Sequence, residues 1–357
     1  MVSKSNRLIL LLAIGTAIRV FAFFPEAVEK YYTHGIYPVV SIIQRFLFGW
    51  VPFSVGDLLY AWAVLYLIRG VVLMIRRIAR KEARTEYWLR VWRRIAFTVV
   101  WIYILFNGLW GLNYNRVGIA RQLDLLVTSY TTEELAMLVN ASIDQLHQLD
   151  TMALARRDAL YKKRVLFGQA IAAYEKVQPT LPFLRYRRPS VKPSLYSYLG
   201  NYLGYTGYYN PFSGEAQVNT TVPMTQQPFT TSHEIGHQLG FAKENEANFV
   251  GYLVARDSDD PAVRYSVYFD LYIYAARNLA VRDSSLAKSL HARLPELAKQ
   301  DLRALRDFYK KYENPFEPII RILYGQYLKA NEQPQGILSY DEVVAWVIAY
   351  YRKYGRI

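Results

Sequence analysis

The stretch that decides how this chain is interpreted lies at residues 230–249 and reads TTSHEIGHQLGFAKENEANF. Within it, His233 and His237 are four residues apart, and Glu234 directly follows the first histidine. On a helix, positions four apart face the same side, so both imidazoles can bind one Zn²⁺ ion. Glu234 would then reach a water bound to that ion. The pattern predicts a single zinc site with His233 and His237 as ligands and Glu234 as general base.

The helix that carries this motif has recognisable start and stop signals. Thr230, Thr231 and Ser232 are N-cap candidates upstream of it, because their hydroxyl groups can accept from the first free backbone N–H groups. Gly240 can end the helix in a left-handed turn, which other residues adopt at a cost. The sequence therefore predicts a helix from about Thr231, a turn at Gly240 and a second helix after it.

The second helix is expected to supply the third ligand. Glu244 and Glu246 lie about 200° apart around a helix, so only one of them can point at the metal. Asn248 follows Glu244 by four residues and shares its face, where it would hydrogen-bond a ligand histidine and fix its tautomer. On this spacing both glutamates are candidates, Glu244 as the preferred ligand and Glu246 as the alternative.

The amino-acid composition excludes several classes of protein and of metal site. The chain has 357 residues, of which 52% are hydrophobic and 20% are charged, and it contains no cysteine. Disorder, a disulfide scaffold and any thiolate metal site are thereby excluded. The length allows one large domain or two of ordinary size.

The N-terminal third is typical of a membrane protein. Apolar runs at about 8–24, 55–75 and 95–112 predict three transmembrane helices. Tyr37–Val51 is shorter and contains Arg45, which favours an amphipathic or re-entrant segment. A lipid bilayer is therefore an expected partner.

The charge distribution predicts an orientation. The net charge is +14, and residues 76–94 carry much of this excess between the second and third runs. Short basic loops stay in the cytoplasm, so the N-terminus would lie inside and everything after about Tyr114 outside. No basic-plus-aromatic recognition motif accompanies the charge, so no nucleic-acid partner is expected. We expect a membrane region at 1–114 and an extracytoplasmic domain at 115–357.

The second region is expected to be mainly α-helical with a small β-sheet, an α+β domain. Thr131 and Glu134 form a capping box that opens a helix, and Ser339–Glu342 forms another before the last helix. Pro179–Gly214 is rich in Pro, Gly and Tyr, which favours turns and short strands. Glu215–Thr220 alternates polar and apolar residues and predicts a strand.

That strand would lie just before the motif helix, and we expect it to bind substrate. If it is an edge strand, it can pair with the backbone of an extended peptide and hold it across the metal. The candidate residues for this pairing are Ala216, Gln217, Val218 and Asn219.

The motifs resemble those of known families. Glu244–Asn248 is similar to the third-ligand helix of gluzincin-type zinc metallopeptidases, in which the first glutamate binds zinc and the residue four later supports a histidine. The chain as a whole resembles domain-of-unknown-function family 3810, a family of bacterial membrane proteins. This resemblance covers nearly the full length and implies a zincin-like domain outside three membrane helices, in the bacterial inner membrane. The matching pieces are Pro52–Asp57, Trp110–Tyr114, Gly214–Ala216 through the zinc motif to Glu246–Phe249, and the Ser339-Tyr340 helix.

We expect a membrane-anchored zinc peptidase that acts on a peptide or protein substrate in the cell envelope. A zinc ion held by two histidines and Glu244 lowers the pKa of its bound water, and Glu234 takes the proton. A Tyr, His or Arg would stabilise the oxyanion, and the sequence does not single one out. The alternatives are a catalytically silent zinc-binding protein that acts in binding or sensing, and a structural membrane protein with a coincidental motif.

Overall fold

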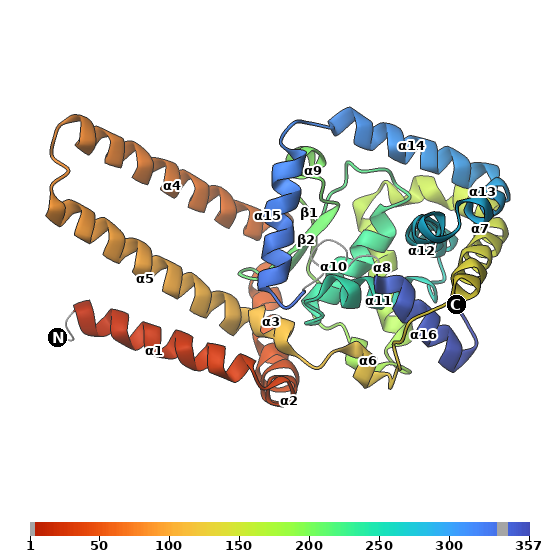
Figure 1. The fold of residues 1–357 in the computed structure, drawn as a ribbon, viewed down its shortest axis with the longest axis horizontal. Coiled ribbons are helices and arrows are strands. Elements are labelled where there is room, and N and C mark those ends of the chain that lie inside the picture. The colour runs from red at the N-terminus through yellow and green to blue at the C-terminus, as the bar shows by residue number, and fades with distance from the viewer. Residues whose placement is uncertain (1–3, 334–341) are drawn as a thin grey trace. The chain divides into compact units, whose positions relative to one another are not determined.

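The computed structural model describes residues 4–333 and 342–357, and Figure 1 shows it as a ribbon. The expectation of a mainly α-helical fold with a small β-sheet is confirmed, since helices dominate and the described residues form one small sheet of three strands. The zincin-like character of the second region stays a prediction. The chain divides into two compact units. Unit 1 comprises Met1–Val117 and Asn210–Glu215, and unit 2 comprises Gly118–Tyr209 and Ala216–Ile357.

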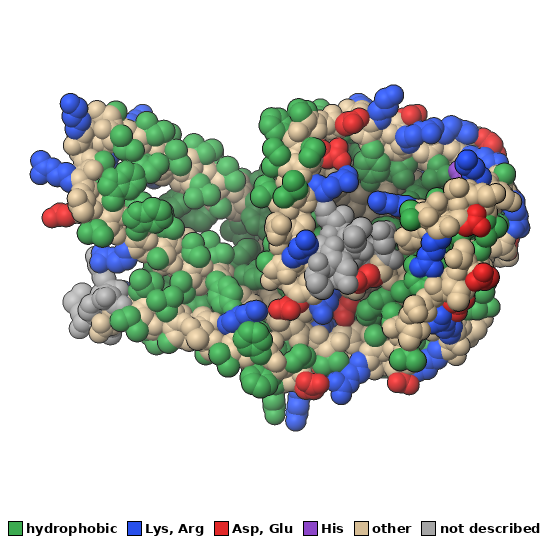
Figure 2. Space-filling view, in the orientation of Figure 1, with side chains coloured by type: hydrophobic (Ala, Val, Ile, Leu, Met, Phe, Trp, Pro, Cys, Tyr) green, Lys and Arg blue, Asp and Glu red, His purple; other side chains and the backbone are tan. Residues whose placement is uncertain are grey.

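Unit 1 contains long helices joined by short turns. α1 is in contact with α5, and Figure 2 shows hydrophobic side chains along α4 and α5. Its elements are α1 (Lys4–Ala22), α2 (Pro25–Ala27), the π-helix η1 (Val28–Ile36), α3 (Tyr37–Phe48), α4 (Val55–Ala79), α5 (Thr85–Leu109) and the 3-10 helix η2 (Gly111–Asn115).

The expectation of three membrane spans is wrong in number. Within the described residues, α4 alone is long and apolar enough to cross a bilayer, with a mean hydropathy of 2.1 and no part of its apolar window buried. The first predicted span qualifies only if Asn6–Ala22 and Pro25–Phe48, which are bent by 100°, form one broken span. The third fails because the apolar part of α5 begins after Arg94 and the helix ends at Leu109, so it falls short of 18 residues.

The start of α4 explains why a short distant segment belongs to unit 1. Ser54 caps the helix, its Oγ accepting from Asp57 N at 3.0 Å. Glu215 also accepts from the free N–H groups of this first turn, from Val55 N at 3.2 Å and from Gly56 N at 2.7 Å. A carboxylate at a helix N-terminus is stabilised by the unpaired N–H groups and the helix dipole. The Asn210–Glu215 segment is thereby fixed to the beginning of the candidate membrane helix.

Unit 2 carries the sheet and the remaining helices. Its elements are α6 (Ile119–Gln122), α7 (Thr132–Leu160), α8 (Lys163–Val177), the 3-10 helix η3 (Pro182–Leu184), β1 (Val191–Pro193), α9 (Ser197–Leu203), β2 (Gly207–Asn210), β3 (Glu215–Val218), α10 (Gln227–Gln238), α11 (Glu244–Ala255), α12 (Pro261–Arg282), α13 (Ser284–Ala292), α14 (Glu296–Tyr312), α15 (Glu317–Ala330) and α16 (Val343–Tyr354). Asn210, at the end of β2, and Glu215, at the start of β3, are grouped with unit 1.

The predicted capping box at the start of α7 is confirmed. Thr131 Oγ1 accepts from Glu134 N, and Thr131 N donates to Glu134 Oε2. Of the second predicted box, Ser339, Tyr340 and Asp341 lie outside the described residues, and α16 is described from Val343.

One apolar core holds unit 2 together. The long helices α7 and α12 pack along each other, and α10 lies among α8, α11 and α12. Ile143 of α7, Phe269 of α12, Ile235 of α10 and Phe249 of α11 are fully buried in the same cluster. Burial of such side chains contributes on the order of 1.5–3 kcal/mol each. The motif helix is therefore an interior element, and all twelve of its residues are buried.

The sheet has an order that the sequence did not reveal. β3 lies between β1 and β2, and it pairs in parallel with β1, with Ala216 opposite Val191 and Val218 opposite Pro193. The interpretation of Ala216, Gln217, Val218 and Asn219 as an edge strand is therefore wrong, because both sides of β3 already have strand neighbours. The alternation of polar and apolar residues indicated a strand but could not tell an edge strand from a central one.

Candidate metal centre

The motif helix begins earlier than its hydroxyl residues suggested. α10 starts at Gln227, so Thr230, Thr231 and Ser232 all lie inside it and are not N-caps. The last two make hydrogen bonds within the helix. Their hydroxyl groups donate back to the carbonyls of Gln227, at 2.7 Å, and Pro228, at 3.2 Å. Pro228 in the first turn needs no N–H partner and has the φ that a helix requires.

A small residue on each helix lets α10 and α11 approach closely. A Cβ at Gly236 would lie 3.3 Å from Val250 Cγ1, and a Cβ at Gly251 would lie 3.3 Å from the backbone N of His233. Between the helices the chain reverses at Gly240, where φ is +86° as predicted from the sequence. The close crossing brings the first turn of α11 beside the two histidines.

At this crossing the three expected donor groups converge. Glu244 Oε2 lies 3.3 Å from His233 Nε2 and 3.7 Å from His237 Nε2. His233, Glu234 and His237 can each offer a ligand atom within 4.8 Å of the others. His237 Nδ1 is 2.7 Å from the carbonyl of Phe241, which accepts a hydrogen bond when that nitrogen carries the proton. This tautomer leaves the lone pair on Nε2, the nitrogen that faces Glu244.

Other residues orient the Glu244 carboxylate. Tyr324 of α15 donates its hydroxyl hydrogen to Glu244 Oε1 at 3.0 Å. Gln333 Oε1 accepts from Glu244 N at 2.9 Å, which satisfies an N–H group in the first turn of α11. With Oε1 held by Tyr324, Oε2 is the oxygen presented to the histidines. Neither Tyr324 nor Gln333 has a signal in the local sequence, because both lie some 80 residues or more downstream.

Burial and mutual charge shift the pKa values of these groups. Burial raises the pKa of Glu234 to about 8. For Glu244 burial acts in the same direction, but hydrogen bonds from His233 and His237 outweigh it and hold the carboxyl pKa well below its usual range. The pKa of His237 is raised to about 9, since its contacts with Glu244 outweigh burial, whereas burial lowers the pKa of His233. A buried carboxylate that stays ionised beside imidazoles suits the binding of a cation.

The two glutamates of α11 point to different places. Glu246 Oε1 accepts from Ile119 N at 3.3 Å, and a Cβ at Gly118 would lie only 2.1 Å from the same oxygen. Glu246 thus fixes the chain just before α6, while Glu244 faces the histidines. The expectation that only one of them can face the site agrees with this geometry, and the role of Glu244 as a metal ligand stays a prediction.

Asn248 lies one turn after Glu244 on α11 and contacts His233. Hydrogen bonding to its side chain offsets part of the effect of burial on the pKa of His233. This is the neighbourhood in which the sequence placed it, and its role in supporting a metal ligand stays a prediction as well.

The donor set fits a divalent cation. Among the described residues, the buried Glu234 Oε2 has no hydrogen-bond partner, and the buried Glu244 Oε2 has only the two histidine Nε2 atoms close to it. Burying carboxylate oxygens in this way is costly unless a proton or a cation satisfies them. Two imidazole nitrogens and one carboxylate oxygen are the ligands that catalytic zinc sites use, with one position left for water.

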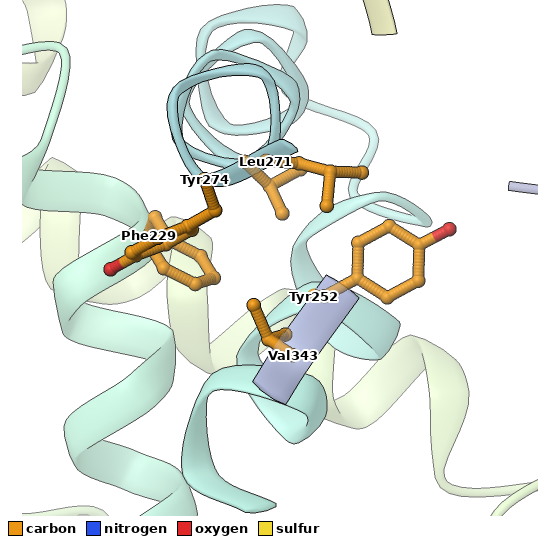
Figure 3. A pocket seen from close by; sticks show the side chains of 6 residues that line it. Phe229, Tyr252, Leu271, Tyr274 and Val343 are labelled. Atoms are coloured by element: carbon orange, nitrogen blue, oxygen red, sulfur yellow. The ribbon is translucent and has the colours of Figure 1, made fainter. Parts of the chain in front are cut away.

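A nearby cavity does not serve as a second site. It measures about 10 Å³ and lies between α10, α11, α12 and α16, lined by apolar atoms. Figure 3 shows Phe229, Tyr252, Leu271, Tyr274 and Val343 around it. A void of this size holds at most about one water, and an apolar one stays dry. It is a small packing defect of the core and offers no room for a ligand.

Comparison with known proteins places the chain in a family. A model of the family described as Protein of unknown function (DUF3810) matches residues 32–348. No curated protein and no solved structure matches the chain. The resemblance of α11 to the third-ligand helix of gluzincins is not supported by these comparisons and stays a prediction. The match spans most of the sequence, and the chain therefore belongs to the DUF3810 family.

Proposed function

We propose that this protein is a zinc-dependent peptidase attached to a membrane. One observation carries the proposal: Glu244 Oε2 lies within 3.7 Å of the Nε2 atoms of both His233 and His237, with the Glu234 carboxylate in the same cluster. Two of these donors come from α10 and the third from α11. A structural role alone does not require a second carboxylate, on Glu234, that is buried with an oxygen for which the described residues supply no partner.

In this proposal His233, His237 and Glu244 hold the ion, and Tyr324 and Asn248 position two of these ligands. A bound Zn²⁺ would supply Lewis acidity, polarising a carbonyl and lowering the pKa of a water. Glu234 accepts the proton of the attacking water and returns it to the leaving amine. Because Glu234 is buried, the charge interactions in which it takes part are stronger than they would be in water.

The edge strand β2 is the better candidate for binding a peptide, now that β3 is known to be central. Its first residue, Gly207, lies against Glu234, since a Cβ there would fall 2.6 Å from Glu234 Oε1. An extended peptide paired with β2 would therefore run beside the general base. This replaces the assignment of substrate pairing to Ala216–Asn219.

The membrane attachment rests on α4, which meets the length and hydropathy requirements for a span. The basic segment that follows α4 favours a cytoplasmic position for the turn between α4 and α5. Glu215 contacts the first turn of α4, at the end opposite this basic turn, and the chain continues from Glu215 into unit 2. We therefore propose that unit 2 is extracytoplasmic in a bacterial inner membrane. A reporter enzyme that folds only outside the cytoplasm, fused after Ile357, should be active. An inactive fusion beside an active cytoplasmic reporter would contradict this orientation.

Metal analysis and one substitution test the function. Purified protein should contain about one zinc ion per chain, in line with a single three-ligand site. Glu234→Gln should retain that zinc, while turnover of a fluorescence-quenched peptide library falls about 10²–10⁴-fold, the usual contribution of a general base. Glu296→Gln, at an exposed position on α14, is the matched control and should change neither quantity.

Three outcomes would count against the proposal in different ways. Protein without zinc would reject the metal site. Zinc without turnover of any library member would favour a protein that binds zinc and acts in binding or sensing. Zinc with full turnover in Glu234→Gln would show that Glu234 is not the base.

A further inference from the structure

Two neighbouring helices of unit 2 expose large apolar side chains to solvent. Six of them, on α9, on α15 and at the residue just before α15, are more than 50% exposed, and we call these six the α9/α15 surface. Its members, with their exposed fractions, are Tyr198 (71%), Leu199 (53%), Phe316 (66%), Ile319 (56%), Ile322 (63%) and Leu323 (66%). Hydrophobic side chains on α15 can be seen in Figure 2. Isolated exposed hydrophobic residues are ordinary, but a cluster of this kind marks an interface.

The two helices form one surface because the structure ties them together. α9 contacts both α14 and α15. Asn314, in the turn before α15, donates from Nδ2 to the carbonyl of Tyr202 at 2.8 Å. The rings of Tyr202 and Tyr312 pack edge to face, with centroids 5.1 Å apart. The surface is thus a continuous part of the fold.

α15 has the composition of a helix that lies on a membrane surface. Among its residues, all of which are described, only Leu328 is buried. A helix with so little contact to the core gains almost no stability from packing within the protein. Its apolar side chains remain available to contact a lipid bilayer or another molecule. Aromatic residues at the edge of an apolar face are typical of the boundary between lipid and water.

Basic residues flank the apolar side chains. Lys310 and Lys311 lie in the last turn of α14 and Lys329 lies in the last turn of α15, all three exposed. Arg321 forms an ion pair with Glu317 on the same helix at 3.0 Å, and Glu313 lies between the two helices, so the lysines carry the positive charge of this segment. Lysine and arginine beside an apolar helix face are attracted to anionic headgroups, at about 1 kcal/mol for each charge near the surface. Lys310, Lys311 and Lys329 therefore favour a bilayer with anionic lipid over an uncharged protein surface.

We propose that the α9/α15 surface docks onto an anionic bilayer. A bilayer is the occupant that the chain itself brings close, because α4 has the length and hydropathy of a span. Tethering raises the effective concentration of a second contact, so modest apolar burial is enough for docking. The inference does not depend on zinc or on peptide cleavage.

Docking of α15 would also reach the candidate metal centre. Tyr324 lies on the same helix and donates to Glu244 Oε1. Ordering of α15 on a bilayer would therefore restrict the motion of Tyr324, which positions the Glu244 carboxylate. If the proposed function holds, the substrates are peptide segments that lie at a membrane surface, a consequence that rests on that function.

The absence of cysteine in this sequence allows a clean test on the full chain. Single variants Ile319→Cys and Leu323→Cys carry a nitroxide label, and Val281→Cys, at a site 85% exposed near the end of α12, is the control. The labelled protein is reconstituted into phosphatidylcholine vesicles that contain phosphatidylglycerol. Relaxation of the label by oxygen, which concentrates in lipid, is compared with relaxation by a water-soluble nickel chelate.

Labels at residues 319 and 323 should be relaxed more by oxygen and less by the chelate than the label at residue 281. The ratio of oxygen relaxation to chelate relaxation should be several-fold higher at 319 and 323 than at 281. Equal ratios at all three positions would overturn the proposal, because the surface would then face water. Protection from both reagents at 319 and 323 would also overturn it, since a protein, such as a second copy, would then cover the surface.

A second variant separates this proposal from the function. Ile319→Glu combined with Leu323→Glu should abolish the lipid signature of a label at Leu199→Cys and should leave zinc content unchanged. Persistence of that signature would contradict docking through α15. Variants of Glu244 or Glu234 that lose zinc or turnover should still show lipid contact at the α9/α15 surface. Such a result would show that docking does not depend on the metal site.

Discussion

Gly207 at the start of β2 and Glu234 on α10 are packed so closely that no side chain fits between them. A Cβ at Gly207 would fall 2.6 Å from Glu234 Oε1 and 2.8 Å from Thr230 Cγ2. The backbone of the edge strand β2 therefore packs directly against the carboxylate of Glu234, the candidate base. Any side chain at this position must displace either the strand or the carboxylate.

Gly207→Ala should for this reason impair peptide turnover while it leaves zinc in place. Misplacement of a reacting group by about 1 Å can cost about 10²-fold in rate, and we expect a loss of that order. Steady-state turnover and metal analysis of the same sample measure the two quantities. Gly168→Ala on α8, where a Cβ meets nothing within 4 Å, is the control and should stabilise the protein slightly. Unchanged turnover in Gly207→Ala would show that the contact does not position the base.

The two glutamates of α11 allow a matched comparison. Glu244→Gln removes the charge that faces the histidines. Loss of a residue that only supports a ligand typically costs about 10–100-fold in zinc affinity, and we expect a larger fall here because Glu244 is itself the proposed ligand. Glu246→Gln keeps an oxygen that can accept from Ile119 N and should retain zinc. Competition with a chelator of known affinity gives both values. A reversed pattern would make Glu246 the ligand.

Tyr324→Phe removes the hydroxyl that holds Glu244 Oε1 and leaves the ring. Loss of an outer-shell partner of this kind should weaken zinc binding about 10–100-fold. Tyr327→Phe, on the same helix, is the control and should bind zinc normally. If Tyr324→Phe binds zinc normally and only turnover falls, Tyr324 acts on the substrate and not on the ligand.

A buried ion pair supports the long helices of unit 2. Arg157 donates to both carboxylate oxygens of Asp301, at 2.8 Å each, and the Tyr265 hydroxyl donates to Asp301 Oδ2 at 2.9 Å. Asp301→Ala would leave the guanidinium largely buried without its partner and should cost about 3–5 kcal/mol of unfolding free energy. Denaturant unfolding in detergent measures this. Asp307→Ala, exposed on the same helix, should change stability little, and equal effects of both would show that the pair is not stabilising.

Local patterns were sufficient for features that a few neighbouring residues determine. The capping box at Thr131, the left-handed turn at Gly240 and the mainly helical fold with a small sheet follow from side-chain hydrogen bonding, backbone sterics and hydrophobic periodicity. The same patterns misplaced the start of α10, because hydroxyl groups satisfy carbonyls inside a helix as well as N–H groups at its end. They also overcounted the spans, since an apolar run does not show where a helix bends or ends.

The sequence by itself determined that His233 and His237 share one helix face, with Glu234 next to the first of them, and that only one of Glu244 and Glu246 could join them, because helical geometry is fixed by spacing. Only the tertiary structure decided which one does, since that depends on how closely Gly236 and Gly251 let α10 and α11 cross. It also decided that β3 is central, that Gly207 rests on Glu234 and that Tyr324 reaches Glu244. These contacts join residues far apart in the chain, and their geometry comes from packing of the whole core, which no local pattern encodes.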